Sequence, residues 1–199
     1  MPFEDFSKKE LISILEIIES AQKCTGADQI KDLILKARGV VEADYAVCGL
    51  LGKEKSGAPC ISSYINGNYS DEWVNRYMNE GYAANDPIVR HMSKYSLSRL
   101  WTEIFKEHRD PASTRLLKDA EDFDLKFGVT GGVFVPELDQ VAIFTFAGGK
   151  DRFRAHHKRI MDILVLHLQS ALVTSIATDA ALEKLPDKGM PNWRCKYGL

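Results

Sequence analysis

The sequence lacks a long uninterrupted apolar segment, the feature that a membrane-spanning helix requires. Its longest apolar stretch, residues 160–176, is broken by Asp162, His167 and Gln169, so it does not indicate a membrane span. The first residues of the chain are charged and lack the apolar core of a signal peptide. We therefore expect neither membrane insertion nor export.

The sequence also has few cysteines and little net charge. Cys24, Cys48, Cys60 and Cys195 are far apart and form no CxxC pair, which is too sparse for a disulfide framework and too scattered for a zinc site. A formal net charge of −2 gives no overall field that would attract nucleic acid or an anionic membrane. We expect a protein of the reducing cytoplasm that binds neither directly.

Motifs of common catalytic sites are missing as well: there is no P-loop, no GxGxxG and no serine nucleophile elbow. Cys48 lies between apolar neighbours on a predicted strand, which favours an inert core thiol over a nucleophile. His157 and His167 are ten residues apart, whereas two metal ligands on one helical face lie three or four apart. We expect no enzymatic activity, metal or cofactor, and we interpret the basic residues between 150 and 159 as a solvated helix face.

What is present is a regular alternation of helix and strand signals. Residues that typically cap helix N-termini precede the segments with helical periodicity: Ser7, Thr25, Ser70, Asp86 and Asp110. Four segments are predicted strands: residues 44–52, 59–66, 126–136 and 140–146. An irregular segment containing Trp101 is expected between the two Asp–Pro pairs, and Gly39 is placed to end the second helix.

The last long element, residues 152–185, is a predicted helix with two adjacent apolar faces. Leu164 and Leu168 lie on one face, and Met161 and Val165 lie on the other. So wide an apolar stripe predicts burial on two sides. We expect the sheet to cover one face and a second subunit to cover the other, which would make a homodimer.

The predicted element order, ααββααββα, bunches the strands between helices and argues for helices on both faces of an antiparallel sheet. No interior linker divides the chain, so we expect one domain over residues 1–185. Residues 186–199, with two prolines and two glycines, are expected to be a C-terminal tail.

An aromatic and acidic constellation occupies the middle of the sequence. Trp73 and Tyr77 are four residues apart on a predicted helix, and Tyr69 at its start can reach the same side. Three rings with polar tips could wall a cavity, and Asp86 would add a hydrogen-bond acceptor. Aromatic residues at this spacing are more often core than ligand site, and Asp before Pro is usually an N-cap, so spacing alone leaves both interpretations open.

The pattern Tyr69-x3-Trp73-x3-Tyr77-x8-Asp86-Pro87, followed by Trp101, resembles the autoinducer-binding domain of LuxR-type quorum-sensing regulators. Phe127-Gly128-Val129 with Gly132 and Pro136, and then Phe144-Thr145-Phe146, resemble the second half of that domain. The resemblance implies an α+β fold: an α-β-α sandwich with a five-stranded antiparallel sheet, helices on both faces, and a PAS- or GAF-like shape.

The resemblance also implies a ligand, an N-acyl-homoserine lactone, and a role for each matching residue. Trp73 would donate to the lactone carbonyl, Asp86 would accept from the amide N–H, and Tyr69 would donate to the acyl carbonyl. Thr145 would lie near the same oxygen or a 3-oxo group. Further matching positions would pack on the ligand, admit it near the backbone or line the acyl pocket: Tyr77, Trp101, Gly132, Val47, Gly49, Leu51, Ser63 and Val89.

Regulators of this type continue into a DNA-binding helix-turn-helix module, which fourteen residues of tail cannot hold. We expect either a ligand-binding fragment or a naturally short protein that could pair with a full-length relative. Two other hypotheses stay open: an enzyme of similar shape that acts on an amide or lactone, and a dimerisation module whose aromatic cluster is only core.

Overall fold

Local capping signals set most of the helix boundaries in this protein. The computed structural model describes residues 4–95 and 97–182. Ser7 and Glu10 form the predicted capping box at the start of the first helix, and Ser70, Asp86 and Asp110 each cap a later helix. In chain order the elements are α1 (Lys8–Gln22), α2 (Ala27–Val40), β1 (Tyr45–Lys53), β2 (Pro59–Asn66), α3 (Asp71–Asn79), the 3-10 helix η1 (Tyr82–Ala84), α4 (Pro87–Met92), β3 (Arg99–Leu100), α5 (Trp101–Glu107), α6 (Pro111–Glu121), β4 (Phe127–Val135), β5 (Gln140–Gly148) and α7 (Ala155–Leu182).

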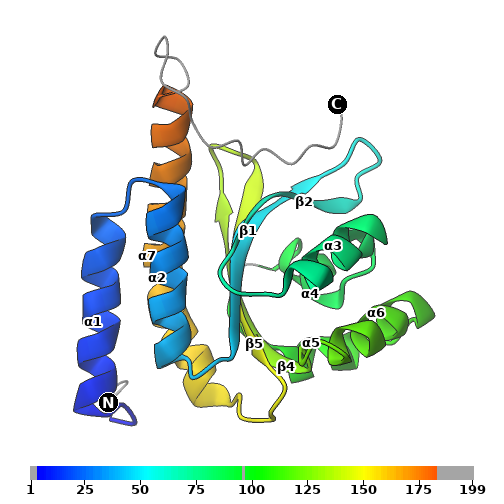
Figure 1. The fold of residues 1–199 in the computed structure, drawn as a ribbon, viewed down its shortest axis with the longest axis horizontal. Helices are drawn as coiled ribbons and strands as arrows, with labels where there is room; N and C mark the ends of the chain where they lie inside the picture. Colours follow the sequence, from blue (N-terminus) through cyan, green and yellow to red (C-terminus); the bar gives the residue numbers. More distant parts are fainter. Residues whose placement is uncertain (1–3, 96, 183–199) are drawn as a thin grey trace.

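The strands form one antiparallel five-stranded sheet in the order β2-β1-β5-β4-β3. Helices α1, α2 and α7 lie on one side of this sheet, with α1 outermost, and α3 to α6 lie on the other (Figure 1). The expected α-β-α sandwich with helices on both faces is thereby confirmed.

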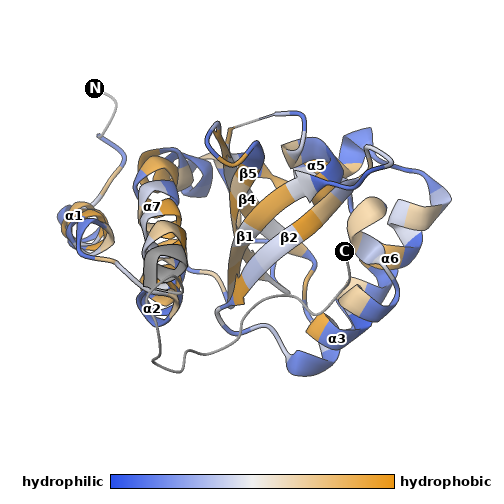
Figure 2. Cartoon of the chain, turned by 90° about the horizontal axis from the view of Figure 1, so that it is seen from above, coloured by the Kyte–Doolittle hydropathy of each residue, from blue (hydrophilic) through white to orange (hydrophobic). Residues whose placement is uncertain are grey.

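Two separate hydrophobic cores follow from this layering. One lies between the sheet and α1, α2 and α7, and includes Ile34, Phe144 and Leu164. The other lies beneath α3 to α6 and includes Trp73, Val89 and Trp101. In Figure 2, apolar residues lie on the strands and on the helix surfaces that face them. The second core contains the aromatic and acidic constellation found in the sequence.

Helix α7 differs from the prediction in what covers its second apolar face. Met161 is fully buried and Val165 nearly so, and both side chains lie against Gly131 of β4, while α7 also packs against α1 and α2. The residues expected to meet a second subunit are therefore part of the protein's own core. The segment Ala155–Thr178 is long and apolar enough to cross a membrane, with a mean hydropathy of 1.7, but this internal packing accounts for its apolar character.

The irregular segment predicted around Trp101 is instead the short strand β3 followed by α5, with Trp101 as the first helical residue. Helix α2 also continues past Gly39 to Val40, since an internal glycine weakens a helix without always ending it. The predicted tail, residues 186–199, lies outside the described residues.

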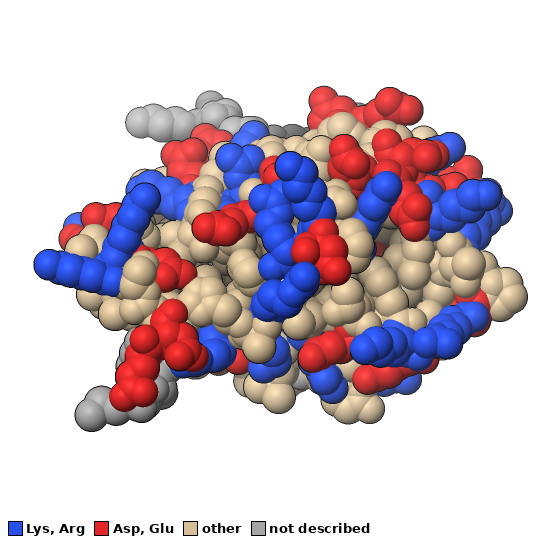
Figure 3. Space-filling view, turned by 90° about the horizontal axis from the view of Figure 1, so that it is seen from below, with Lys and Arg blue, Asp and Glu red and all other residues tan. Residues whose placement is uncertain are grey.

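The basic residues at the start of α7 are largely neutralised by neighbouring carboxylates. Arg152 pairs with Asp44, Arg154 with Asp151, Lys158 with Asp162 and Arg159 with Asp5. On the face seen in Figure 3, lysine and arginine are interspersed with aspartate and glutamate and do not gather into one patch. This agrees with the interpretation of the cluster as a solvated helix face.

Candidate functional site: an apolar cavity with polar groups on one wall

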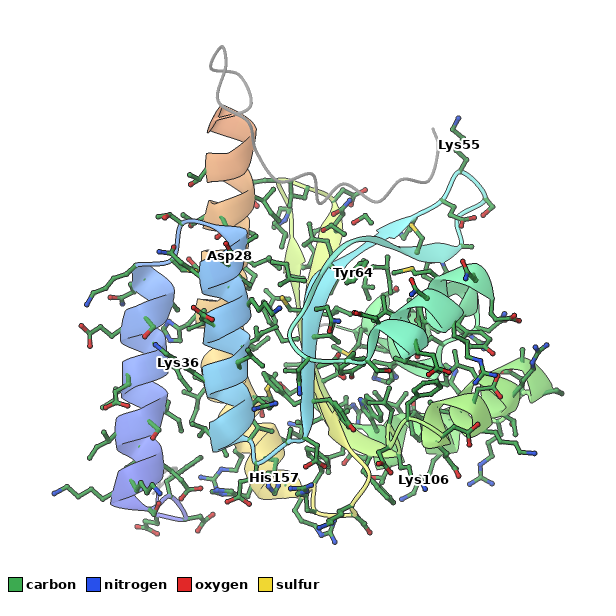
Figure 4. The ribbon with its side chains drawn as sticks, viewed as in Figure 1. Asp28, Lys36, Lys55, Tyr64, Lys106 and His157 are labelled. Atoms are coloured by element: carbon green, nitrogen blue, oxygen red, sulfur yellow. The ribbon has the colours of Figure 1, made fainter. Side chains whose placement is uncertain are left out.

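A cavity of about 110 Å³ lies between the sheet and the helices α3 to α6. Side chains fill the space between these two layers in Figure 4, where Tyr64 marks the β2 side. Most of the lining is aliphatic or aromatic, and it comes from β1, β2 and β5 on one side and from four helices and their connections on the other. The polar groups are few: Tyr64, Tyr69, Trp73, Tyr77, Asp86 and Thr145.

Asp86 performs two tasks at once, one with each carboxylate oxygen. Its Oδ1 accepts from the backbone N–H groups of Ile88 at 2.7 Å and Val89 at 3.4 Å, which caps α4. Its Oδ2 accepts from the hydroxyl of Tyr77 at 2.7 Å within the cavity wall. Burial raises the pKa of the Asp86 carboxyl, and the hydrogen bonds from Tyr77 and the backbone act in the opposite direction. The residue is therefore both a helix cap and a buried acceptor.

Two donors in the same wall have no protein acceptor. The indole N–H of Trp73 and the hydroxyl of Tyr69 make no hydrogen bond to any residue in the described ranges. Trp73 is only 5% exposed, and burial raises the pKa of the Tyr69 hydroxyl, so both groups are largely withdrawn from solvent. Buried donors usually have a partner. The cavity thus offers two open donors beside one carboxylate.

The arrangement of these rings is set by α3 and by the segment after it. Trp73 and Tyr77, one helical turn apart, meet edge-on with centroids 5.8 Å apart. Trp73 also packs against Tyr82 and against Phe123. Asn66 fixes the backbone of Tyr69: its side-chain oxygen accepts from the Tyr69 N–H, and its side-chain amide donates to the Tyr69 carbonyl. The open donors therefore sit on a packed aromatic wall.

A second hydrogen-bonded group crosses the sheet surface on the same side. The indole N–H of Trp101 donates to Thr130 Oγ1 at 2.9 Å, and Thr130 Oγ1 lies 3.1 Å from Thr145 Oγ1, where either hydroxyl can donate. Thr130 is completely buried, whereas Thr145 lines the cavity. The indole N–H of Trp101 therefore already has an acceptor within the protein. Thr145 is the member of this hydrogen-bonded group that lines the cavity.

The comparison with known families bears on what this cavity is for. Residues 26–173 match the family described as the autoinducer binding domain, and this range includes the whole sheet and every wall of the cavity. This chain belongs to the autoinducer-binding domain family.

Individual relatives agree with that assignment. The autoinducer-binding domain is 35% identical over 68 residues to the transcriptional activator protein PhzR of Pseudomonas fluorescens, a match that covers 34% of this chain and 26% of PhzR. Its fold is similar to that of the LuxR-family factor CepR2 from Burkholderia cenocepacia, with 19% identity, a TM-score of 0.67 and coverage of 86% and 98% of the two chains. Escherichia coli SdiA gives 16% identity, a TM-score of 0.67 and coverage of 89% and 72%.

The autoinducer-binding domain brings most of the sequence-predicted site residues to one cavity. Eight of the twelve line it: Val47, Tyr69, Trp73, Tyr77, Asp86, Val89, Trp101 and Thr145. Leu51 is buried in the same core without lining the cavity. A Cβ on Gly132 would lie 2.7 Å from Met92 Cε, so this glycine makes room for α4. Gly49 and Ser63 contact a separate small hollow beside α7.

The misplacement of Ser63 has a definite cause in the pairing of β1 with β2. Leu50 pairs with Ser63, but the next residue, Leu51, pairs with Ile61, so Ser62 is an extra residue in β2. A bulge of this kind shifts the alternation of side chains by one. Ile61 and Tyr64 therefore line the cavity of the autoinducer-binding domain in place of Ser63.

Sequence reasoning also missed three groups that support the cavity. Thr130 connects Trp101 to Thr145 and lies on β4 between Val129 and Gly132 of the motif. Gly128 lies so close to Trp101 that an added Cβ would be 2.7 Å from the indole ring, so a side chain there would displace Trp101. Leu116 on α6 closes the apolar end. The glycine was visible in the motif, whereas nothing local marked Thr130 or Leu116.

Proposed function

We propose that this domain binds an N-acyl-homoserine lactone in the cavity between the sheet and α3 to α6. The observation that carries the proposal is the pairing of two open donors, on Trp73 and Tyr69, with one buried carboxylate, Asp86. The ligand has two carbonyl acceptors, one amide donor and an apolar chain, so its polar groups match these three in number and in kind.

The roles follow from the direction in which each group can bond. The indole N–H of Trp73 can only donate and would take the lactone carbonyl. The Tyr69 hydroxyl would donate to the acyl carbonyl, and Asp86 would accept the amide N–H. Thr145 would meet an oxygen further along the acyl chain. Val47, Val89 and the other apolar residues would enclose the chain, with Tyr77 and Trp101 packing on it.

We further propose that the domain is the sensory unit of a LuxR-type transcription regulator of the cytoplasm and has no catalytic role. It would act either as part of a longer regulator or as a short partner that pairs with one. Self-association or pairing with a related regulator would transmit the signal. The apolar residues that remain exposed for such a contact include Leu15 on α1 and Leu166 on α7.

Ligand-dependent stabilisation tests the proposal. A ligand that binds only the folded state stabilises it by about 2.7 kcal/mol at a hundredfold excess over its dissociation constant. For a domain of this size we expect a rise in melting temperature of about 5–10 °C, with one acyl chain length giving the largest shift. Lack of any shift across lactones with acyl chains of about four to fourteen carbons would refute lactone binding.

A monoacylglycerol distinguishes this proposal from a sensor of another ligand. One solved structure is of SdiA in complex with octanoyl-rac-glycerol, which carries an ester and hydroxyls but no amide N–H. We expect octanoyl-homoserine lactone to stabilise this domain more than octanoyl-glycerol, because only the lactone gives Asp86 an amide donor. Mass spectrometry of the recovered lactone tests the enzyme alternative, which requires ring-opened or deacylated product.

A further inference from the structure

Outside the cavity, the described residues contain one cluster of side chains suited to binding a metal ion. His91 at the end of α4, Glu107 at the end of α5 and His108 just after it each offer a ligand atom, and these atoms lie within 4.8 Å of one another. His91 and His108 are nearly perpendicular, with ring centroids 6.3 Å apart. Two imidazoles and a carboxylate are the donor set of many zinc sites.

His91 is the unusual member of this cluster. It is only 2% exposed, yet neither of its ring nitrogens has a hydrogen bond within the described residues. Glu107 Oε2 lies 3.3 Å from Nδ1, but the contact is poorly aligned for a hydrogen bond. Leaving a buried polar group unpaired is costly. A metal ion bound to one of the two nitrogens would satisfy that atom.

The other two ligands have room to approach an ion. The carboxylate of Glu107 is half exposed and His108 is partly exposed, so small rotations would bring them to the metal–ligand distance of about 2.0–2.2 Å. The two arginines near the cluster are paired with carboxylates, Arg90 with Asp110 at 2.8 Å and Arg99 with Glu103 at 3.5 Å.

We propose that His91, Glu107 and His108 form a binding site for a divalent transition-metal ion of the zinc type. Three protein ligands leave a fourth position to water. The site would tie the end of α4 to the end of α5. Both helices wall the cavity, α4 through Val89 and Asp86 at its N-terminus and α5 through Trp101. This metal site does not depend on which ligand the cavity binds.

Zinc titration of the full chain by calorimetry tests this site. We expect one Zn²⁺ per chain, and a dissociation constant that rises by about 100-fold or more in both Glu107→Gln and His108→Asn. These two residues are accessible, so the variants should fold normally. His156→Asn is the control, because His156 also belongs to a histidine pair and contacts Glu10 but is far from the cluster in the fold; it should bind zinc as the unmodified protein does.

Two further readouts identify the ligands. The d–d bands of bound Co²⁺ should be those of nitrogen and oxygen ligands, without the charge-transfer band that a thiolate such as Cys60 would give. Saturating Zn²⁺ should raise the melting temperature of the unmodified protein by several degrees, and of His108→Asn by much less. Absence of zinc binding at 100-micromolar metal, or equal binding by the unmodified protein, Glu107→Gln and His108→Asn, would overturn the proposal.

Discussion

At the scale of single residues, Asp86 combines helix capping with a second acceptor role in the cavity wall. Its two oxygens point to different partners, one to the backbone of α4 and one to Tyr77 in the cavity. Sequence reasoning posed these as competing explanations because Asp before Pro is a common cap. The carboxylate geometry allows both.

Asp86→Asn should separate the two roles. The amide oxygen can still cap α4, so we expect the melting temperature of the ligand-free protein to change little, or to rise slightly because a buried charge is removed. Lactone affinity should fall by about 10- to 150-fold, because the charged hydrogen bond to the ligand amide is lost. Calorimetric titration with the best-stabilising lactone measures this change.

Asp110→Asn is the matched control. Asp110 also precedes a proline and caps a helix, but it bonds Ser113 and Arg90 and does not line the cavity. Its replacement should lower stability modestly and leave lactone affinity unchanged. Equal affinity in both variants and the unmodified protein would mean that Asp86 is a cap alone.

Replacing Trp73 or Trp101 by phenylalanine should have opposite relative effects on stability and on lactone binding. The Trp73 indole N–H has no protein acceptor, so Trp73→Phe should cost the ligand-free protein only the packing of the lost ring atoms and should weaken lactone binding by about tenfold, the value of one neutral hydrogen bond. Trp101 already donates to Thr130, so Trp101→Phe should lower stability by about 1–3 kcal/mol and affect binding less. Urea denaturation and calorimetry on each variant distinguish these patterns, and the reverse ranking would contradict the assigned donor.

At the scale of helices and strands, the sequence predicted what is decided locally. Ser7, Ser70 and Asp110 were recognised as caps because each bonds a backbone N–H within its own first turn. Helix α5 was missed because Leu100, at its N-cap, offers no side-chain hydrogen bond. Ser63 was placed on the wrong side because the extra residue in β2 is a property of the β1–β2 pairing, which the β2 sequence does not record.

Most of the cavity could be predicted for a similar reason. The spacing of Tyr69, Trp73 and Tyr77 predicted that they share one side of a helix and its cap, and the resemblance to the autoinducer-binding domain implied that this side lines a ligand cavity. Thr130 could not be predicted, since its role depends on meeting Trp101 and Thr145 from three separate segments. The surroundings of α7 were also misjudged, because a sequence does not show that α1 and α2 pack on this helix in addition to the sheet.

The contact between Glu10 on α1 and His156 on α7 predicts that the stability of the fold depends on pH. Hydrogen bonds from Ser7 and then from His156 lower the pKa of Glu10 from 4.5 to about 2. Because the folded-state pKa is depressed, the stability contributed by Glu10 is present above pH 4.5 and is lost as the pH falls toward 2. Glu10→Gln keeps the capping hydrogen bond but removes the charge, and should cost about 1 kcal/mol at pH 7 after allowance for solvent screening.

Urea denaturation between pH 3 and pH 7 measures this effect. The stability difference between Glu10→Gln and the unmodified protein should shrink steadily below pH 4.5. Glu16→Gln, an exposed change on the same helix, should show no such trend. A pH-independent difference for Glu10→Gln would show that its cost comes from packing instead of charge.

At the scale of the whole molecule, the sheet separates two layers with different tasks. The α3 to α6 layer holds the cavity, while α1, α2 and α7 build a second core on the opposite face. A structural change caused by a bound ligand would therefore reach a partner either through the sheet or directly from α3 to α6. The exposed apolar residues of the α1 and α7 layer are the surface available for a partner on the far side.

If the domain self-associates through α7, Leu166 is the residue to change. It is 59% exposed, so Leu166→Glu should leave the far-ultraviolet circular dichroism and the melting temperature unchanged and yield a monomer. Val165→Glu, one residue away, would bury a charge in the core and should unfold the protein. Light scattering decides the matter, and an unmodified protein that is already monomeric at high concentration would rule out this dimer.

The extra residue in β2 has a consequence for how ligand range can diverge among relatives. A one-residue slip in hairpin pairing exchanges the side chains at the cavity wall without any substitution in the wall itself. Moving the bulge past Ser63 would pair Gly49 with Ser63 in place of Tyr64, while Ile61 would stay opposite Leu51; a large aromatic side chain at the wall would become a small hydroxyl. Insertions and deletions near the β1–β2 turn, which leave the Tyr69 to Asp86 motif untouched, are therefore a route by which evolution or a protein engineer can retune this sensor.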